Sequence, residues 1–275
     1  RNSYGTTYGK HREFLELTIS QYKQLKKYAA KRKMLLVCTA FDEESLLELE
    51  SINIQAYKIA SADITNLPLI RKVASTRKPT FMSTGASSMK DVELAFKTFT
   101  KVHNNLCIMQ CTSIYPPKYD QLNLNVINSY KKKFKNNIIG LSSHESGIAM
   151  DVVAYVMGVR VIEKHVTLNR AMKGTDHAFS LEPVGMRKMV RDLQRVHVAI
   201  GDGQKKAYAS ETSAILKMGK RLVAARDLPA GHVVKLDDVD IKSPGGGVPP
   251  FELDRIVGLS TLQSVKKDEE FDLET

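Results

Sequence analysis

The sequence predicts an α/β fold, a (β/α)8 TIM barrel followed by a small β-rich domain, and three observations lead to it. Six short apolar runs begin at residues 34, 55, 80, 106, 138 and 161, a spacing that suits alternating strands and helices. Polar residues follow nearly every run. After about residue 218 the helical patterns stop, and short β-type runs alternate with turns rich in glycine and proline.

The predicted barrel strands are short, apolar and continuous, which is typical of strands buried on both faces of a parallel sheet. They cover Met34–Thr39, Gln55–Ile59, Thr80–Ser83, Leu106–Cys111, Ile138–Leu141 and Val161–His165. Amphipathic segments predict the helices Ile19–Arg32, Glu43–Ile52, Leu67–Ser75, Ser88–Thr100, Leu124–Phe134, Ile148–Met157 and Met186–Ile200.

These six βα units fit either an open doubly wound sheet or most of a barrel. No Gly-x-Gly-x-x-Gly follows any strand, which counts against a dinucleotide-binding sheet. The polar residues lie at many strand ends rather than at one switch point, and this distribution favours the barrel. A barrel needs two more strands. Because the chain opens at Arg1 with a polar stretch, we expect them upstream.

The change of pattern gives three predicted regions, which are a barrel over 1–200, a linker over 201–218 and a β-rich domain over 219–275. Turn signals such as Pro244-Gly245-Gly246-Gly247 separate the short runs of the last region. These β-type runs are Arg221–Ala225, Val239–Ile241, Val257–Leu259 and Leu262–Val265.

Composition narrows the functional class. The 275 residues are 43% hydrophobic and 26% charged, which excludes general disorder. The net charge of +11 calls for an anionic partner, and without a groove-reading motif we expect small phosphorylated substrates rather than nucleic acid. No apolar run approaches the roughly 18 residues of a membrane span. The sparse cysteines Cys38, Cys107 and Cys111 predict reduced thiols and a cytoplasmic setting.

His144 and His165 carry the sharpest chemical signal. They end adjacent predicted strands, so both imidazoles would face one point at the barrel mouth. Two neutral imidazoles with open positions suit a divalent metal that also takes oxygen ligands. Glu163 shares the face of His165 and would bind the metal, order its water or position substrate. Alternatively, both histidines are structural and hydrogen-bonded within the protein.

Lys58 ends an otherwise apolar strand, and burying a lysine without an anion is costly. With Thr39 and Ser61 on neighbouring strand ends, a phosphate or carboxylate is a natural partner. The alternative is an internal salt bridge with Asp63. Further hydroxyl donors at this rim are Ser83, Thr84, Ser113 and Ser142.

Two loop residues are further candidates. Tyr115, before Pro116-Pro117, would line a sugar site or pack its own loop. Asp176, within Lys173–His177, would hydrogen-bond a polyol or belong to a surface turn.

Several motifs, taken in order from about Tyr8 to the C-terminus, resemble the sialic acid synthase family. The tail from about Gly219 is similar to the SAF (antifreeze-like) domain that ends these enzymes. The resembling motifs are Ala56-Tyr57-Lys58-Ile59-Ala60-Ser61-Ala62-Asp63, Ser83-Thr84-Gly85, Gln110-Cys111-Thr112-Ser113-Ile114-Tyr115-Pro116, Gly140-Leu141-Ser142-Ser143-His144, Glu163-Lys164-His165-Val166-Thr167 and Lys173–Pro183.

The resemblance implies an enzyme that condenses phosphoenolpyruvate with an N-acylated aminohexose, usually N-acetylmannosamine or its 6-phosphate. The products are a nonulosonic acid, N-acetylneuraminate or its 9-phosphate, and phosphate. The resemblance also implies a homodimer in which the SAF domain of one chain caps the barrel of the other. It further implies that Mn²⁺ or Mg²⁺ is held by the histidines that match His144 and His165. Phosphoenolpyruvate ligands match Thr39, Lys58, Ser61, Ser113 and Ser142. Residues around the sugar, metal or water match Asp63, Tyr115, Glu163 and Asp176.

This sequence departs from the family pattern in three places. First, the acidic residue, the Asn-His pair and the Lys of the family's first two strands are absent. Second, Ser243 stands where many bacterial members carry an Arg that reaches the N-acetyl group. Third, Ser143 stands where many bacterial members have an Asp. Synthases of legionaminic, pseudaminic or spore-coat sugars share the motifs and are an alternative. An inactive dimeric relative without the first barrel strands is the second alternative.

Overall fold

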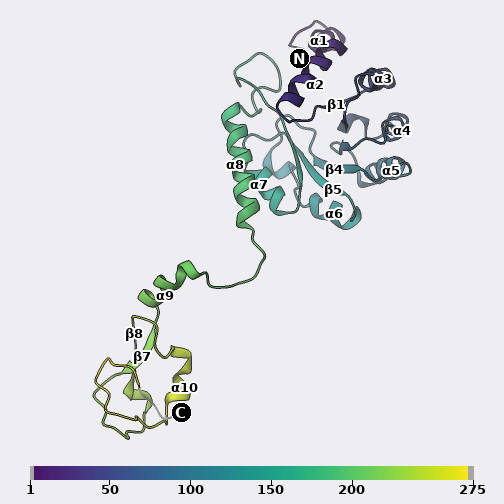
Figure 1. The fold of residues 1–275 in the computed structure, drawn as a ribbon. Helices are drawn as coiled ribbons and strands as arrows, with labels where there is room; N and C mark the ends of the chain where they lie inside the picture. Colours follow the sequence, from purple (N-terminus) through teal and green to yellow (C-terminus); the bar gives the residue numbers. More distant parts are fainter. Residues whose placement is uncertain (1–2, 272–275) are drawn as a thin grey trace. The chain divides into compact units, whose positions relative to one another are not determined.

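The chain folds as two compact units, Arg1–Gly201 and Asp202–Thr275, in a computed structural model that describes residues 3–271. The first unit holds a six-stranded parallel sheet, and the second a two-stranded antiparallel sheet (Figure 1). Each unit has its own cluster of buried apolar side chains.

The first unit confirms the predicted alternation of strands and helices. Its strands are β1 (Val37–Thr39), β2 (Ala56–Ile59), β3 (Thr80–Ser83), β4 (Leu106–Cys111), β5 (Ile138–Ser143) and β6 (Val161–Lys164). Its helices are α1 (Tyr8–Leu15), α2 (Ile19–Lys31), α3 (Glu43–Ser51), α4 (Leu67–Ser75), α5 (Met89–Thr100), α6 (Val126–Lys133), α7 (Ala149–Val156) and α8 (Pro183–Ala199).

Two details at the start of this unit differ from the prediction. Strand β1 begins at Val37 rather than Met34, and the side chains of Met34 and Leu35 are 65% and 68% exposed. Helix α1 lies in the polar opening stretch, for which no helix was predicted. It begins after Thr7, whose side chain accepts a hydrogen bond from the Lys10 amide, and none of its residues is buried.

The sheet is part of a barrel. Its strands are hydrogen-bonded neighbours in sequence order from β1 to β6, without the reversal that a doubly wound sheet requires, so that alternative is wrong. In a flat sheet β2 and β6 would lie about 19 Å apart. Nevertheless Lys58 Nζ on β2 lies 3.5 Å from Glu163 Oε2 on β6. The six strands therefore curl into a partial (β/α)8 barrel.

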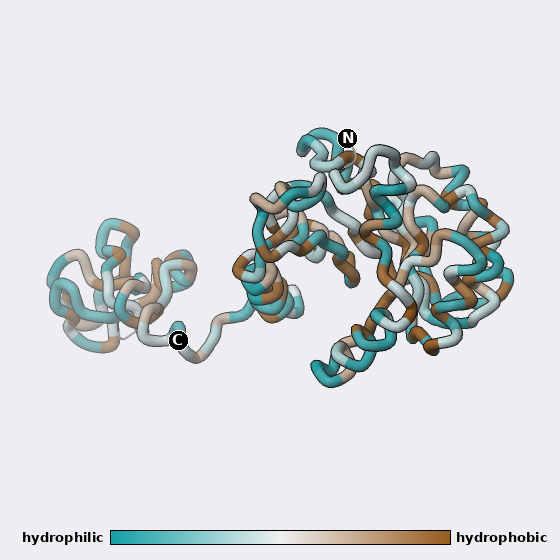
Figure 2. Tube along the Cα trace, turned by 90° about the horizontal axis from the view of Figure 1, so that it is seen from above, coloured by the Kyte–Doolittle hydropathy of each residue, from teal (hydrophilic) through white to brown (hydrophobic). Residues whose placement is uncertain are grey.

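The main hydrophobic core lies between the outer face of this sheet and its helices. Tyr57 and Ile59 of β2 belong to it, together with Ile70 and Val73 of α4. Figure 2 shows hydrophobic segments alternating with hydrophilic ones along the chain of this unit. Because side chains alternate along a strand, Lys58 between Tyr57 and Ile59 points to the inner face. The core thus fixes which polar side chains reach the barrel interior.

The second unit has strands at two of the predicted β-type runs, β7 (Arg221–Ala224) and β8 (Val239–Lys242), which pair with each other. The other two expected strands are wrong. Val257–Leu259 holds Gly258, which turns the chain at a positive φ of 93°, and only the following Ser260 forms an isolated bridge, to Val233. Leu262–Val265 contributes one isolated bridge, from Val265 to Leu228. Two short helices, α9 (Thr212–Met218) and α10 (Leu253–Ile256), complete the unit, and α9 lies within the stretch predicted as linker.

A buried carboxylate joins three parts of this second unit. Asp238 is 1% exposed, and its oxygens lie 2.7 Å from His232 Nε2 and 2.6 Å from Arg226 Nη2. The Lys235 amide donates a further hydrogen bond. Burial alone would raise the pKa of Asp238, but these hydrogen bonds outweigh it and lower the pKa to about 2.

Asp238→Ala should lower the unfolding free energy of this unit by about 3 kcal/mol at neutral pH, because hydrogen bonds to a charged group are lost. Since the folded pKa lies below the ordinary value, the stabilisation is present above about pH 4 and is lost as the pH falls towards 2. Calorimetry across that range checks both effects. Asp240→Ala, at a carboxylate 50% exposed on β8, is the control and should change little.

Candidate functional site

His144 and His165 lie side by side at the mouth of the partial barrel. His144 follows β5 and His165 follows β6, and their ring centroids are 5.0 Å apart with the planes inclined by 77°. The structure therefore brings together the two imidazoles that the strand spacing predicted to be neighbours. The residue His144 is 5% exposed and the His165 side chain 30%, so one ring is buried and the other is open to solvent.

The surroundings of both imidazoles favour their neutral form. Burial lowers the pKa of His144 and of His165, and for His165 the neighbouring His144 lowers it further. The Nδ1 atom of His144 lies 3.1 Å from the Thr112 carbonyl oxygen. A carbonyl only accepts, so Nδ1 carries the hydrogen and Nε2 keeps its lone pair. This is the tautomer in which Nε2 can bind an electrophile.

Two aromatic rings enclose the histidines. The Tyr115 ring lies 4.3 Å from the His144 ring and 6.1 Å from the His165 ring, between centroids. Phe179 lies 5.1 Å from the His165 ring and is 3% exposed. Tyr115 was predicted to line the site, whereas Phe179 was not singled out. Its only signal was its place in the loop that also carries Asp176.

A charged cluster occupies the inner face next to the histidines. Lys58 Nζ donates to Ser83 Oγ at 2.7 Å and lies 3.5 Å from Glu163 Oε2. Ser142 Oγ donates to Glu163 Oε1 at 2.8 Å. Burial lowers the pKa of Lys58, and the Glu163 carboxylate opposes that shift. Ser142 and Glu163 precede His144 and His165 by two residues each, so the cluster and the imidazoles share one face.

The expected alternative of an ion pair between Lys58 and Asp63 is wrong. Asp63 instead accepts a hydrogen bond from Asn66 Nδ2 at 3.0 Å. It lies in a 3-10 turn over Ser61–Asp63, after the end of β2. The chain turns away from the strand there, which carries the carboxylate away from Lys58, and Glu163 takes its place across the barrel.

The hydroxyls of Ser61 and Ser113 meet at Gly85. The Gly85 amide donates to Ser61 Oγ at 2.9 Å. A Cβ atom at this position would lie 2.1 Å from Ser113 Oγ and 3.0 Å from Ser61 Oγ, so a side chain here would displace the Ser113 hydroxyl. Thr39 on β1 pairs in register with Lys58 on β2. The predicted hydroxyls therefore lie on successive strand ends around the lysine.

Asp176 approaches the histidine pair from the loop after β6. Its Oδ2 lies 3.6 Å from His165 Nδ1, and its Oδ1 accepts a hydrogen bond from Thr175 Oγ1 at 2.9 Å. The carboxylate is 52% exposed, so it can meet a ligand entering from solvent. Of the predicted site residues, Asp63 has its carboxylate bonded to Asn66 instead, and Thr39 joins the constellation only through the backbone pairing of β1 with β2.

Comparison with known proteins agrees with this geometry. The model of the NeuB family matches residues 1–205, and the model of the SAF domain matches residues 221–269. The chain belongs to the NeuB family. The prediction of this family with a C-terminal SAF domain is confirmed.

Similar NeuB-family proteins carry names of different products. The chain is 34% identical over 270 residues to N-acetylneuraminate-9-phosphate synthase of Homo sapiens, covering 98% of this chain and 75% of that protein. It is 33% identical over 258 residues to N,N'-diacetyllegionaminic acid synthase of Campylobacter jejuni, covering 93% and 77%. The N-acetylneuraminic acid synthetase of Leptospira borgpetersenii, solved with citrate, matches with a TM-score of 0.70, 30% identity, and coverage of 78% and 76%.

The histidine pair of this NeuB-family chain fits a divalent metal that keeps open coordination positions. Within residues 3–271 no group of three His, Cys, Asp or Glu side chains is placed to hold an ion. Two neutral imidazoles would leave the remaining positions to water and substrate oxygens, which Mn²⁺ and Mg²⁺ accept readily. The donor set therefore suits an ion that binds substrate, rather than a closed structural site.

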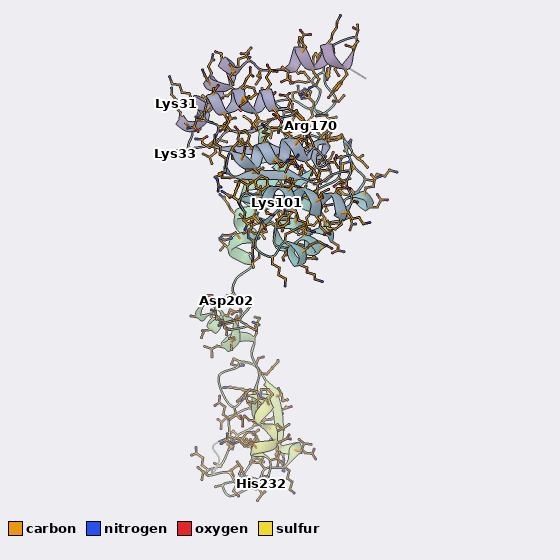
Figure 3. All side chains as sticks on the ribbon, turned by 90° about the vertical axis from the view of Figure 1, so that its right-hand side faces the viewer. Lys31, Lys33, Lys101, Arg170, Asp202 and His232 are labelled. Carbon is orange, nitrogen blue, oxygen red and sulfur yellow. The ribbon has the colours of Figure 1, made fainter. Side chains whose placement is uncertain are left out.

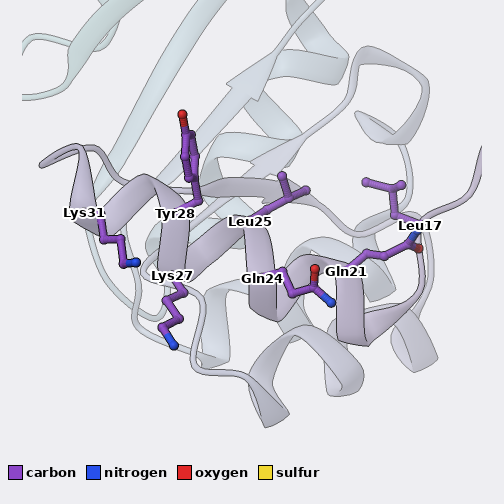
Figure 4. Close-up of a pocket in the computed structure, with 7 residues that line it drawn as sticks. All are labelled: Leu17, Gln21, Gln24, Leu25, Lys27, Tyr28 and Lys31. Carbon is purple, nitrogen blue, oxygen red and sulfur yellow. The ribbon is translucent and has the colours of Figure 1, made fainter.

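A second surface of the first unit differs from this site in its side chains. An open hollow along α2 is lined by Leu17, Gln21, Gln24, Leu25, Lys27, Tyr28 and Lys31, none of which is a predicted site residue (Figure 4). Lys31 and Lys101, labelled in Figure 3, are exposed near the C-terminal ends of α2 and α5, where cations suit the helix dipole. Among the residues that the structure describes, no helix is long and apolar enough to cross a membrane.

Proposed function

We propose that this NeuB-family chain condenses phosphoenolpyruvate with N-acetylmannosamine or its 6-phosphate. The products would be N-acetylneuraminate or its 9-phosphate, and inorganic phosphate. The observation that carries the proposal is the pair of neutral imidazoles beside the cluster of Lys58, Ser83, Ser142 and Glu163 on one inner face. The names of the human and Leptospira relatives support the choice of sugar.

Phosphoenolpyruvate would bind at Lys58. Its trianion would replace Glu163 as the counter-charge of the ammonium group, which water screens weakly because the Lys58 side chain is 11% exposed. Thr39, Ser61, Ser113 and Ser142 supply neutral hydroxyls on the surrounding strand ends. This arrangement would hold the donor in line with the acceptor, which lowers the entropic cost of the reaction.

The acceptor sugar would bind at the histidines. His144 and His165 would hold Mn²⁺ or Mg²⁺, which when bound acts as a Lewis acid on the open-chain aldehyde. Tyr115 and Phe179 would form the apolar wall of this subsite, and Asp176 would accept hydrogen bonds from the sugar hydroxyls. Asp63, whose second carboxylate oxygen is buried, would need to turn from Asn66 to take part.

In the reaction, C3 of phosphoenolpyruvate would form a bond to the aldehyde carbon while the π pair of the aldehyde C=O bond moves to its oxygen, which takes up a proton from solvent to become a hydroxyl. The C2 atom of phosphoenolpyruvate would become cationic. A water oxygen would then bond to C2, and Glu163, whose carboxylate lies beside Lys58 and Ser142, would accept the proton that this water loses. The bond between C2 and the phosphate oxygen would then break, and the remaining proton of the former water would leave with the phosphate, so that the keto group of the product remains. Lys58 would stabilise the negative charge of the departing phosphate.

The test is phosphate release from phosphoenolpyruvate by the purified protein with Mn²⁺ and then with EDTA. N-acetylmannosamine and its 6-phosphate are offered separately. We expect release that depends on the sugar and stops with EDTA, and the sugar that supports it identifies the substrate. Release without any sugar would contradict a condensation.

Related nonulosonic acids are the second candidate, because the legionaminic acid synthase of C. jejuni is nearly as similar as the human relative. Activity with the acceptor sugar of a legionaminic, pseudaminic or spore-coat product, and with neither mannosamine, would select this candidate. No activity with any acceptor, from a folded protein loaded with metal, would favour the inactive relative.

We also propose a homodimer, which light scattering would detect as twice the chain mass of 30.7 kDa.

A further inference from the structure

A buried ion cluster lies on the opposite face of β5 and β6 from the histidines. Lys164 Nζ donates to Glu145 Oε1 at 2.7 Å and to Ser143 Oγ at 2.9 Å, and lies 3.6 Å from Asp151 Oδ2. Ser143 Oγ in turn donates to Asp151 Oδ1 at 2.9 Å. The three charged side chains are at most 2% exposed. One cation therefore joins two carboxylates out of contact with water.

The position of the cluster follows from strand alternation. Ser143 and Lys164 are flanked by residues that point into the barrel, so their own side chains point outward. Asp151 lies in the first turn of α7, which packs against β5. The cluster is thus enclosed between the sheet and this helix. It does not touch the inner face where substrate would bind.

Such a cluster is a poor way to stabilise a core. Removing charges from water carries a penalty that the ion pairs offset only in part, and apolar residues of similar size often serve as well. One oxygen each of Glu145 and Asp151 has no hydrogen-bond partner, and burial raises the pKa of Asp151 although Lys164 opposes it. The net contribution of the cluster to stability is therefore small, and its distinctive property is that it links the ends of β5 and β6 to α7.

We propose that Glu145, Lys164, Ser143 and Asp151 are positioning residues that set the separation of the two imidazoles. Glu145 directly follows His144, and Lys164 directly precedes His165. The ion pair on the outer face therefore spans the same strand gap as the ring pair on the inner face. Ser143 and Asp151 tie both strand ends to α7, so neither backbone segment shifts without breaking buried charge pairs. The inference rests on the proposed metal site.

The first measurement is the affinity of the protein for Mn²⁺, titrated by electron paramagnetic resonance. Lys164→Met should raise the Kd about 10-fold or more, as is typical when residues that orient metal ligands are lost. Lys164→Arg keeps the cation and should restore most of the affinity. Ser143→Ala removes one neutral bridge, so it should fold even if Lys164→Met does not, with a smaller rise in Kd.

The second measurement needs no metal. Amide hydrogen exchange in the metal-free protein should accelerate at 143–146 and 164–166 in Lys164→Met, and remain unchanged at 56–59. Lys78→Met is the matched control, because Lys78 forms a partly buried ion pair with Glu50 near the start of β3, at the other end of the strands. It should lower the melting temperature without changing either the Mn²⁺ affinity or exchange at the histidines.

The outcomes separate the two ideas. If the wild-type protein binds no Mn²⁺, the proposed metal site fails, while local exchange still decides whether the cluster positions the strand ends. If wild type binds Mn²⁺ but Lys164→Met matches Lys78→Met in both Kd and exchange pattern, the positioning role is overturned. The same conclusion follows if Ser143→Ala leaves both readouts at wild-type values when Lys164→Met does not fold.

Discussion

His165→Ala should lower kcat/KM for metal-dependent phosphate release by about a thousandfold or more. The proposed metal has two protein ligands, so loss of one imidazole removes half of them and with them several kcal/mol of Lewis-acid stabilisation. The fold should survive, because the His165 side chain is 30% exposed. Steady-state kinetics with saturating Mn²⁺, together with Mn²⁺ titration, measure the loss.

His144 needs a different variant. The sequence predicted His144 at the barrel mouth, and the structure places it there but buried, with 5% exposure, against Tyr115 and the Thr112 carbonyl. Alanine would leave a cavity and confuse ligand loss with unfolding. His144→Asn retains much of the volume and a donor, and should reduce kcat/KM as strongly as His165→Ala.

The matched control for both histidines is His197→Ala. His197 lies in α8, where its Nδ1 is 2.7 Å from the Tyr155 hydroxyl, and it has no part in the proposed site. Activity should stay within about twofold of wild type, since surface substitutions cost little. Near-normal activity of either site variant would refute the two-histidine assignment.

Lys58→Met should raise the KM for phosphoenolpyruvate about a hundredfold while changing that for the sugar far less. The ammonium group is the proposed counter-charge of the donor, and truncating one partner of a buried charge pair costs about 2–5 kcal/mol. The variant also leaves Glu163 without its cation, which would repel the incoming trianion. Initial rates with each substrate varied in turn measure the two KM values.

The control is Lys78→Met, which breaks a partly buried lysine–glutamate pair remote from the site. It should leave both KM values unchanged. Lys58→Arg keeps the positive charge and should recover part of the affinity for phosphoenolpyruvate. Equal effects of Lys58→Met on both substrates would show that Lys58 supports the barrel rather than the donor.

Local pattern was sufficient to predict the barrel strands and the histidine pair. Continuous apolar runs are typical of strands covered on both faces, and β2 to β6 follow them closely. Consecutive parallel strands are usually neighbours, so residues that end β5 and β6 must lie near each other. His144 and His165 therefore lie side by side because they end neighbouring strands that are separated by a single βα unit.

Contacts that cross several strands were not predictable in this way. Lys58 was weighed against Asp63, five residues away, but it pairs with Glu163, more than a hundred residues along the chain. Only the curl of the whole sheet brings β2 opposite β6. The place of Phe179 beside His165 likewise depends on how a long loop folds back.

The sequence by itself determined the order of the strands, the inner face of each and the pairing of the histidines, because side-chain alternation and neighbouring strands are local constraints. The tertiary structure decided the counter-ion of Lys58, the burial of His144 and the ion cluster around Lys164. Those features depend on the curvature of the sheet and on how closely α7 packs against it. Both are properties of the assembled core, to which residues far apart in the chain contribute together.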